Sequence, residues 1–257
     1  MNRFRMTTLI SRRAALRIVL SATAAGLTPV LQSAPTRAQE PGSRPLLGAI
    51  RWDAWYAPGS GPTEAVRKSL SPGQYHWRAP FFATECNTTE ICLPKGSQTL
   101  IDLEIAQADA AGLDYWAFVA YGEASDLSTA LRLYLSSTRR KRVKFAMFSE
   151  LVRLGKAGIA STMLKEHLEL MKRPDYLRVM ENRPVYFIGF ITEKVLKDNW
   201  GDAAGLKRHI LAFKQSARAE GLGEPYVVLA SVAGPIQDFD FGADALSAYA
   251  IAASVPA

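Results

Sequence analysis

Residues 99–121, TLIDLEIAQADAAGLDYWAFVAY, contain a helix pattern that leads directly into a strand pattern. The first part, 99–111, is amphipathic, and Gly112 is the residue type that most often ends a helix. The second part, 114–121, is an apolar run of strand length that is rich in aromatic side chains. An amphipathic helix that leads into an apolar strand is typical of a parallel sheet covered by helices.

The same alternation recurs along the chain. Five strands and a weaker sixth are predicted, at 46–51, 114–121, 143–149, 184–190, 226–231 and 246–252. Helices are predicted at 99–111, 126–137, 160–172 and 204–220. The pattern fits two α/β architectures, an open doubly wound sheet and a (β/α)8 barrel.

A long insertion and the end of the chain bear on this choice. The insertion, 52–98, is rich in aromatic residues, Gly and Pro, and it follows the first strand, where barrel enzymes carry substrate loops. The chain stops just after the sixth apolar run. Because a sheet that ended there would keep an open edge, we expect a polypeptide shorter than its relatives.

Composition restricts the class of protein. The chain has 257 residues, 48% of them hydrophobic and 21% charged, with a mean hydropathy of −0.02, as in soluble globular proteins. The formal net charge is +7, but the first 38 residues hold six arginines and no acidic residue. These are Arg3, Arg5, Arg12, Arg13, Arg17 and Arg37. The remainder is nearly neutral, so we expect no nucleic-acid partner for the folded part.

Residues 1–38 have the pattern of an export signal. A basic stretch to Arg17 is followed by the apolar run 18–31 and a polar segment that ends at Ala38. The run is about 14 residues long, whereas a membrane-spanning helix needs about 20, so no permanent membrane span is expected. The pair Arg12 and Arg13 resembles the twin-arginine signal of bacteria. We therefore predict an exported, periplasmic or extracellular protein, with a linker at 39–45 and one domain at 46–257.

The predicted export bears on whether the two cysteines form a disulfide. Cys86 and Cys92 lie six positions apart in a polar segment that would meet an oxidising compartment. A disulfide is predicted, and it would mainly rigidify its own short loop. Free thiols and a metal pair are the alternatives, although no second pair of soft ligands lies nearby in the sequence.

Candidate site residues follow the predicted strands, because α/β proteins place their sites at the carboxyl ends of parallel strands. Three carboxylates are catalytic candidates: Asp53, Glu123 and Glu150. Carboxylates can protonate a glycosidic oxygen or stabilise the ion that forms, and aromatic rings stack on sugars. The substrate-binding candidates are Trp52, Trp55, Tyr56, His76 and Tyr121.

Each candidate also has a structural interpretation. Asp53 could cap a turn, and Glu150 could pair with Arg153 at the surface. Glu123 could lie in a solvated loop, and His76 could have only a loop role. The aromatic residues of 52–56 could fill the core under the insertion. The sequence leaves these alternatives open.

Several functional signatures are absent from the sequence. It has no G-x-S-x-G nucleophile elbow, no H-E-x-x-H zinc motif and no phosphate-binding loop of the G-x-x-x-x-G-K-[ST] type. No cofactor and no metal site are therefore predicted.

The order of these segments resembles the glycoside hydrolase family 99-like group, which includes polysaccharide-associated proteins once called glycosyltransferases. The matching segments are 47–56, 101–116, 147–150, 174–185 and 241–249. The resemblance implies a (β/α)8-barrel-like fold, here incomplete with five to six β/α units. It also implies that Asp53 and Tyr56 line a sugar pocket and that Glu150 follows the third strand as a polar site residue.

One departure from the family matters for function. The Asn-Glu-Trp-x-Glu type motif that carries the catalytic glutamates of the family is absent from this sequence. We therefore expect a glycoside hydrolase-like protein that acts on or binds a polysaccharide, in which two carboxylates among the three candidates would flank the glycosidic bond. The alternatives are a non-catalytic carbohydrate-binding envelope protein and a truncated product that lacks the catalytic motif.

Overall fold

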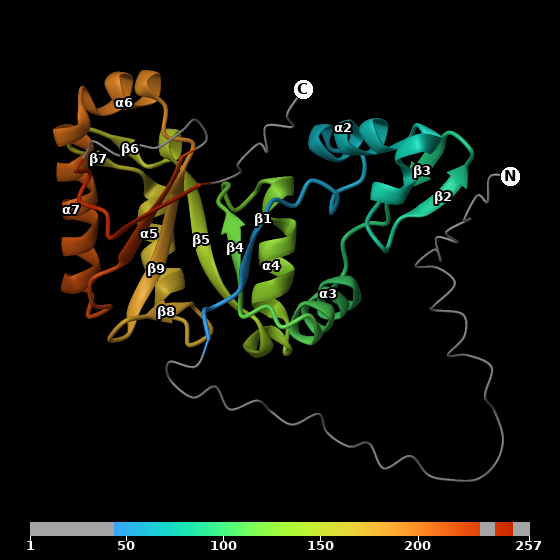
Figure 1. Cartoon of the computed structure of the whole chain (residues 1–257), viewed down its shortest axis with the longest axis horizontal. Helices are drawn as coiled ribbons and strands as arrows, with labels where there is room; N and C mark the ends of the chain where they lie inside the picture. The colour runs from blue at the N-terminus through green and yellow to red at the C-terminus, as the bar shows by residue number, and fades with distance from the viewer. Residues whose placement is uncertain (1–43, 232–239, 249–257) are drawn as a thin grey trace, which may run out of the picture. The chain divides into compact units, whose positions relative to one another are not determined.

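The core of the protein is a parallel sheet whose strands lie side by side in chain order. In the computed structural model, which describes residues 44–231 and 240–248, the described residues from Pro45 onward form one compact unit. Neighbouring strands of the sheet follow one another without a reversal of order. The strands are β1 (Gly48–Arg51), β4 (Tyr115–Val119), β5 (Lys144–Glu150), β9 (Arg183–Gly189), β10 (Tyr226–Ser231) and β11 (Ala245–Ala248) (Figure 1). A short β8 (Arg178–Val179) pairs antiparallel with β9.

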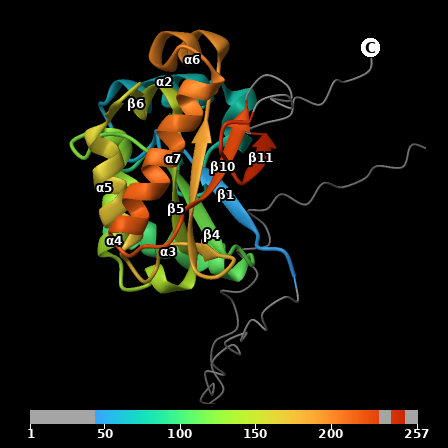
Figure 2. The same ribbon diagram turned by 90° about the vertical axis from the view of Figure 1, so that its left-hand side faces the viewer.

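Helices cover one face of this sheet (Figure 2). They are α3 (Gln98–Ala110), α4 (Thr129–Ser136), α5 (Thr162–Met171) and α7 (Ala203–Ala219), with α6 (Glu193–Trp200) beside α7. Alternate strand residues, such as Trp116, Phe145 and Tyr186, point toward these helices and form the main core. Their neighbours in the strands point to the other face, where Ala117, Phe148 and others form a second cluster.

The strand order and the one-sided helices distinguish the two predicted architectures. A doubly wound sheet reverses its strand order and carries helices on both faces, whereas a barrel keeps chain order and places its helices outside. This sheet curls into a half-barrel with its helices on the convex side. The described residues supply six parallel strands where a complete (β/α)8 barrel has eight, so this half-barrel is compatible with a partial α/β barrel.

Aromatic rings pack on the concave face of the half-barrel. Phe187 stacks with Tyr115 on one side and with Phe148 on the other, with ring centroids 6.2 Å apart in both pairs. Two glycines make room for these rings. A Cβ on Gly48 would lie 2.1 Å from the Tyr115 ring, and a Cβ on Gly189 would lie 2.1 Å from the Phe148 ring.

Local signals set the helix ends. Side chains at the N-caps accept hydrogen bonds from the first-turn amides of α3, α5, α6 and α7, through Ser97, Ser161, Thr192 and Asp202. Gly112 and Gly221 follow α3 and α7 with φ of +80° and +74°, a conformation that favours glycine. The predicted strand 226–231 and the observed β10 coincide, and the other predicted strands overlap observed ones.

The insertion after β1 forms its own small substructure. It contains α2 (Gly61–Leu70), the 3-10 helix η2 (Gly73–Arg78) and an antiparallel hairpin of β2 (Thr84–Asn87) and β3 (Glu90–Cys92). The predicted disulfide is confirmed, because Cys86 and Cys92 are bonded across this hairpin with their Cα atoms 5.7 Å apart. A second hairpin pairs β6 (Gly155–Lys156) with β7 (Ile159–Ala160).

Three predicted features differ from the structure or lie outside it. The predicted helix 126–137 is divided into the 3-10 helix η3 (Asp126–Ser128) and α4. The export signal and the last part of strand 246–252 lie outside the described residues. Among the described residues, no helix has both the length and the apolar character that a membrane span requires.

Candidate functional site

Four side chains meet where β1, β4 and β5 end. The indole Nε1 of Trp52 donates a hydrogen bond to the Tyr121 hydroxyl over 2.8 Å. The guanidinium of Arg153 lies over the Tyr121 ring at 4.5 Å from its centroid, and Nε of Arg153 donates to Glu150 over 3.2 Å. We call Trp52, Tyr121, Glu150 and Arg153 the mouth cluster, because it lies at the carboxyl end of the half-barrel.

The mouth cluster belongs to the concave side of the sheet. Tyr121 packs against the concave apolar cluster, together with Phe187 and Phe190. Trp52, which bonds to Tyr121, keeps 44% of its surface exposed. The cluster therefore presents a fixed and partly exposed indole next to a charged pair.

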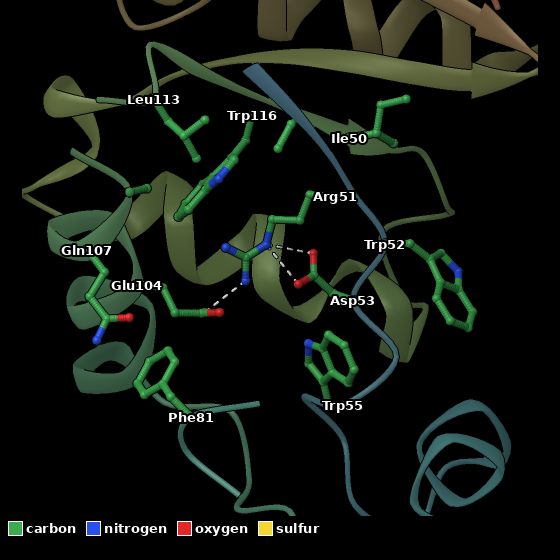
Figure 3. A pocket seen from close by; sticks show the side chains of 12 residues that line it. Ile50, Arg51, Trp52, Asp53, Trp55, Phe81, Glu104, Gln107, Leu113 and Trp116 are labelled. Carbon is green, nitrogen blue, oxygen red and sulfur yellow. Dashed lines mark hydrogen bonds and ion pairs between the residues drawn. The ribbon is translucent and has the colours of Figure 1, made fainter. Parts of the chain in front are cut away.

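Asp53 points away from the Trp52 indole and into a second group of polar residues (Figure 3). Its carboxylate accepts hydrogen bonds from Arg51 Nε over 2.8 and 3.0 Å. Nη2 of Arg51 donates to Glu104 over 2.8 Å and to the Tyr56 hydroxyl over 3.1 Å, and that hydroxyl in turn donates to Glu104. The guanidinium lies 4.3 Å from the Trp116 ring centroid, on the side of the sheet that the helices cover. We call Arg51, Asp53, Tyr56 and Glu104 the Arg51 cluster.

Burial dominates the electrostatics of the Arg51 cluster. Burial raises the pKa of Asp53 and of Glu104, and Arg51 opposes this effect in both. The pKa of Arg51 rises, because its attraction to the two carboxylates exceeds the lowering that its own burial causes. The buried Arg51 guanidinium binds both carboxylates, and it therefore fixes the positions of Asp53 and Glu104.

A cavity of about 380 Å³ lies beside the Arg51 cluster, between β1 and α3 (Figure 3). Its polar lining includes Arg51, Asp53, Glu104 and Gln107, and its aromatic lining includes Trp52, Trp55, Phe81 and Trp116. Figure 3 shows Trp55 and Phe81 on the side of the Arg51 guanidinium opposite Trp116. Trp52 borders the cavity and also belongs to the mouth cluster.

The remaining predicted site residues lie apart from both clusters. Glu123 is exposed in the loop after β4, where its backbone carbonyl accepts a hydrogen bond from Arg132. His76 lies in η2 and donates from Nε2 to the Ser71 carbonyl over 2.6 Å, with Glu85 3.4 Å from Nδ1. The structure thus brings Trp52, Tyr121 and Glu150 together, and it places Asp53 and Tyr56 in a separate buried group.

Sequence reasoning missed Glu104 as a site residue and treated Arg153 only as a surface partner of Glu150. Glu104 lies on α3, 53 positions after Arg51, and no local motif connects the two. Arg51 gave a weak signal, because an arginine at the end of an apolar strand needs a nearby anion once it is buried.

The described residues hold no metal-binding group, and no known protein matches the chain. Within the described part of the chain, no three His, Cys, Asp or Glu side chains gather closely enough to hold a metal ion. Comparison with protein-family models, with curated proteins and with solved structures gave no match.

Proposed function

We propose that this protein binds a carbohydrate at the mouth cluster. The observation that carries the proposal is the Trp52 indole, which is held by Tyr121 and is still 44% exposed. A flat ring that is already fixed can stack on the C–H face of a sugar at a low entropic cost. Next to it, Arg153 can donate hydrogen bonds to sugar hydroxyls and Glu150 can accept them.

Binding without cleavage is the form of the proposal that the geometry supports best. Glycoside hydrolysis uses two carboxyl groups, about 5 Å apart for retention or about 6.5 to 9.5 Å apart for inversion. Of the three candidates, Glu150 alone belongs to the mouth cluster, while Asp53 is engaged by Arg51. A hydrolase, the second candidate, would have to pair Glu150 with the exposed Glu123.

Three further features agree with an exported carbohydrate-binding protein. The leader pattern of residues 1–38 predicts export, and the Cys86–Cys92 disulfide suits an oxidising compartment. The segment order also resembles the glycoside hydrolase family 99-like group. We propose a periplasmic or extracellular location on these grounds.

Calorimetric titration with neutral oligosaccharides tests the binding proposal. The probes are gluco-, manno-, xylo- and galacto-oligosaccharides of two to six residues. We expect Trp52→Ala to weaken binding at least ten-fold, about 1.4 kcal/mol, because it removes the stacking surface. Trp77→Ala is the matched control, since Trp77 is a more exposed tryptophan in η2, and it should change affinity less than two-fold.

The same samples separate binding from catalysis. Chromatography of the oligosaccharides after long incubation should detect no shorter products if the protein only binds. Shorter products that disappear in Glu150→Gln would establish the hydrolase instead. Absence of binding to every probe, or unchanged affinity in Trp52→Ala, would refute the mouth cluster as a carbohydrate site.

A further inference from the structure

We infer that a cavity between the helices α5 and α7 binds a small amphiphilic carboxylate, that is, an aliphatic chain that ends in a carboxylate group. This cavity is a different place from the carbohydrate site proposed above. It shares no lining residue with the cavity beside the Arg51 cluster, and it contains no member of the mouth cluster. The inference is therefore independent of the proposed function.

The cavity lies on the side of the sheet that the helices cover. Its volume is about 430 Å³, which is within the range of small-molecule sites in proteins. Two of its walls are α5 and α7, which Figure 2 shows next to each other, and the β6–β7 hairpin supplies the third. Several wall side chains are short, at Ala157 and Ala160 of the hairpin and at Ala212 of α7, so space remains between the helices.

Buried apolar side chains line the inner part of the cavity. Leu164 and Leu168 of α5 and Phe213 of α7 are 4 to 6% exposed, and all three belong to the main core. The two leucines are four positions apart and so lie on the same face of α5. An aliphatic chain that covered these side chains would be favoured by the hydrophobic effect.

The neutral polar side chains of the lining already have partners. Nε2 of His209 donates to the Leu154 carbonyl over 3.0 Å, and burial lowers the pKa of this histidine, so its ring is neutral near pH 7. The Ser216 hydroxyl donates to the Ala212 carbonyl over 3.1 Å. The hydroxyls of a sugar would find few partners here, so the lining disfavours a carbohydrate ligand.

Two cations of the lining have no partner. Lys165 of α5 and Arg208 of α7 supply one positive charge from each helix, and neither side chain forms a hydrogen bond or an ion pair within residues 44–231 and 240–248. No Asp or Glu is among the described residues that line the cavity. Two positive charges without a counter-ion attract an anion, and a planar guanidinium can donate two parallel hydrogen bonds to a carboxylate.

The apolar lining and the two cations together define the ligand. The chain of an amphiphilic carboxylate would contact the leucines and Phe213, and its charged end would be attracted by Lys165 and Arg208. An uncharged chain would lose the electrostatic attraction, and a carboxylate without a chain would lose the hydrophobic contact. Tight binding should therefore need both parts of the ligand.

Calorimetric titration of the protein with octanoate tests the inference. Octan-1-ol and acetate are the matched probes, because the first lacks the charge and the second lacks the chain. Octanoate should bind about ten-fold more tightly than either probe, or better. Arg208→Gln and Lys165→Gln should each weaken octanoate binding about five-fold and leave octan-1-ol binding unchanged. Lys197→Gln removes the same charge from an exposed position of α6 outside the lining, and it should leave octanoate affinity unchanged.

A bulky side chain inside the cavity tests the location of the site. Ala212→Trp should abolish the binding of octanoate and of octan-1-ol. Gln215→Trp, at an exposed position of α7 outside the lining, is the control and should leave both unchanged. Far-ultraviolet circular dichroism and thermal unfolding confirm that each variant is folded.

Three results would overturn the inference. Octanoate would fail to bind to the wild type, or it would bind to Ala212→Trp with wild-type affinity, or its affinity would be unchanged in both Arg208→Gln and Lys165→Gln. The first two would remove the cavity as a ligand site, and the third would remove the carboxylate as the group that it recognises.

Discussion

His167 is a buried histidine that the proposed function does not use. It lies on α5, 3% exposed, with Nδ1 2.7 Å from the Tyr186 hydroxyl. Burial lowers its pKa to about 3, from 6.5 for an exposed histidine. As the pH falls below about 6.5, the unfolded chain binds a proton that the folded protein does not accept, so stability is lost toward acid.

This difference predicts an acid-sensitive fold. Between pH 7.5 and pH 5, His167 should account for a loss of about 2 kcal/mol in the free energy of unfolding. Urea unfolding at both pH values should show that loss in the wild type, and His167→Gln should reduce it. Tyr186→Phe is the control, because it removes the hydrogen bond and keeps the histidine. An equal pH dependence in wild type and His167→Gln would contradict the assignment.

Single residues also mark the limit of sequence reasoning about the site. Trp52, Tyr121 and Glu150 lie at or just after the ends of three strands, and they could be proposed together because the ends of adjacent parallel strands meet at one edge. Which side of the sheet a residue faces after a strand ends was not predictable. Asp53 follows Trp52 directly, but Arg51 binds its carboxylate on the helix side.

At the scale of elements, a buried ion network ties α7 to the sheet. Lys214 of α7 is 4% exposed, and its Nζ donates to Asp244 over 2.7 Å. Asp244 also accepts from Arg183 of β9 over 2.5 Å and from the Val227 amide of β10 over 2.8 Å. Glu224, 3.3 Å from Lys214, is the second anion of this network.

Asp244 is the central anion of this network, and replacing it with a neutral residue should destabilise the fold. We expect Asp244→Asn to lower the free energy of unfolding by about 3 kcal/mol, because it leaves Lys214 buried with a weaker partner. The double variant with Lys214→Met should recover part of this loss. A double-mutant cycle from urea unfolding measures the coupling, and effects that simply add would show that the pair does not interact.

The helices and strands that could be predicted from the sequence are those with a clear buried face. The long amphipathic helices α3, α5 and α7 and the buried strands could be found because their apolar spacing and end signals agree. The helices α2 and α6 were missed, since each buries a single side chain, Thr63 in α2 and Trp200 in α6, so neither shows a buried apolar stripe. All four residues of β2 are exposed, so no alternation marked that strand.

At the scale of the whole molecule, alternation of strands and helices predicted a parallel α/β fold. It could not show how the sheet curls, because curvature depends on strand order and on packing between distant segments. Gly48 and Gly189 illustrate this, since each makes room for a ring on the neighbouring strand. The Arg51 cluster likewise needs Glu104, which only the closed packing of α3 on β1 brings near.

The Cys86–Cys92 disulfide should matter locally and hardly at all for the whole fold. The hairpin that it closes is exposed, with Ile91 its one buried residue. Replacing both cysteines by serine should reduce the free energy of unfolding by at most about 2 kcal/mol. Limited proteolysis with a non-specific protease should cut 84–92 faster, as mass spectrometry would show. Loss of the whole fold would contradict a local role.

The placement of the tryptophans has an optical consequence. Of the five tryptophans in the chain, Trp52, Trp55 and Trp116 border the same cavity, whereas Trp77 lies in η2 and Trp200 at the end of α6. Three of the five indoles therefore lie around one corner of the half-barrel. A ligand that enters this corner would alter their ultraviolet emission directly, so the unlabelled protein is its own spectroscopic reporter.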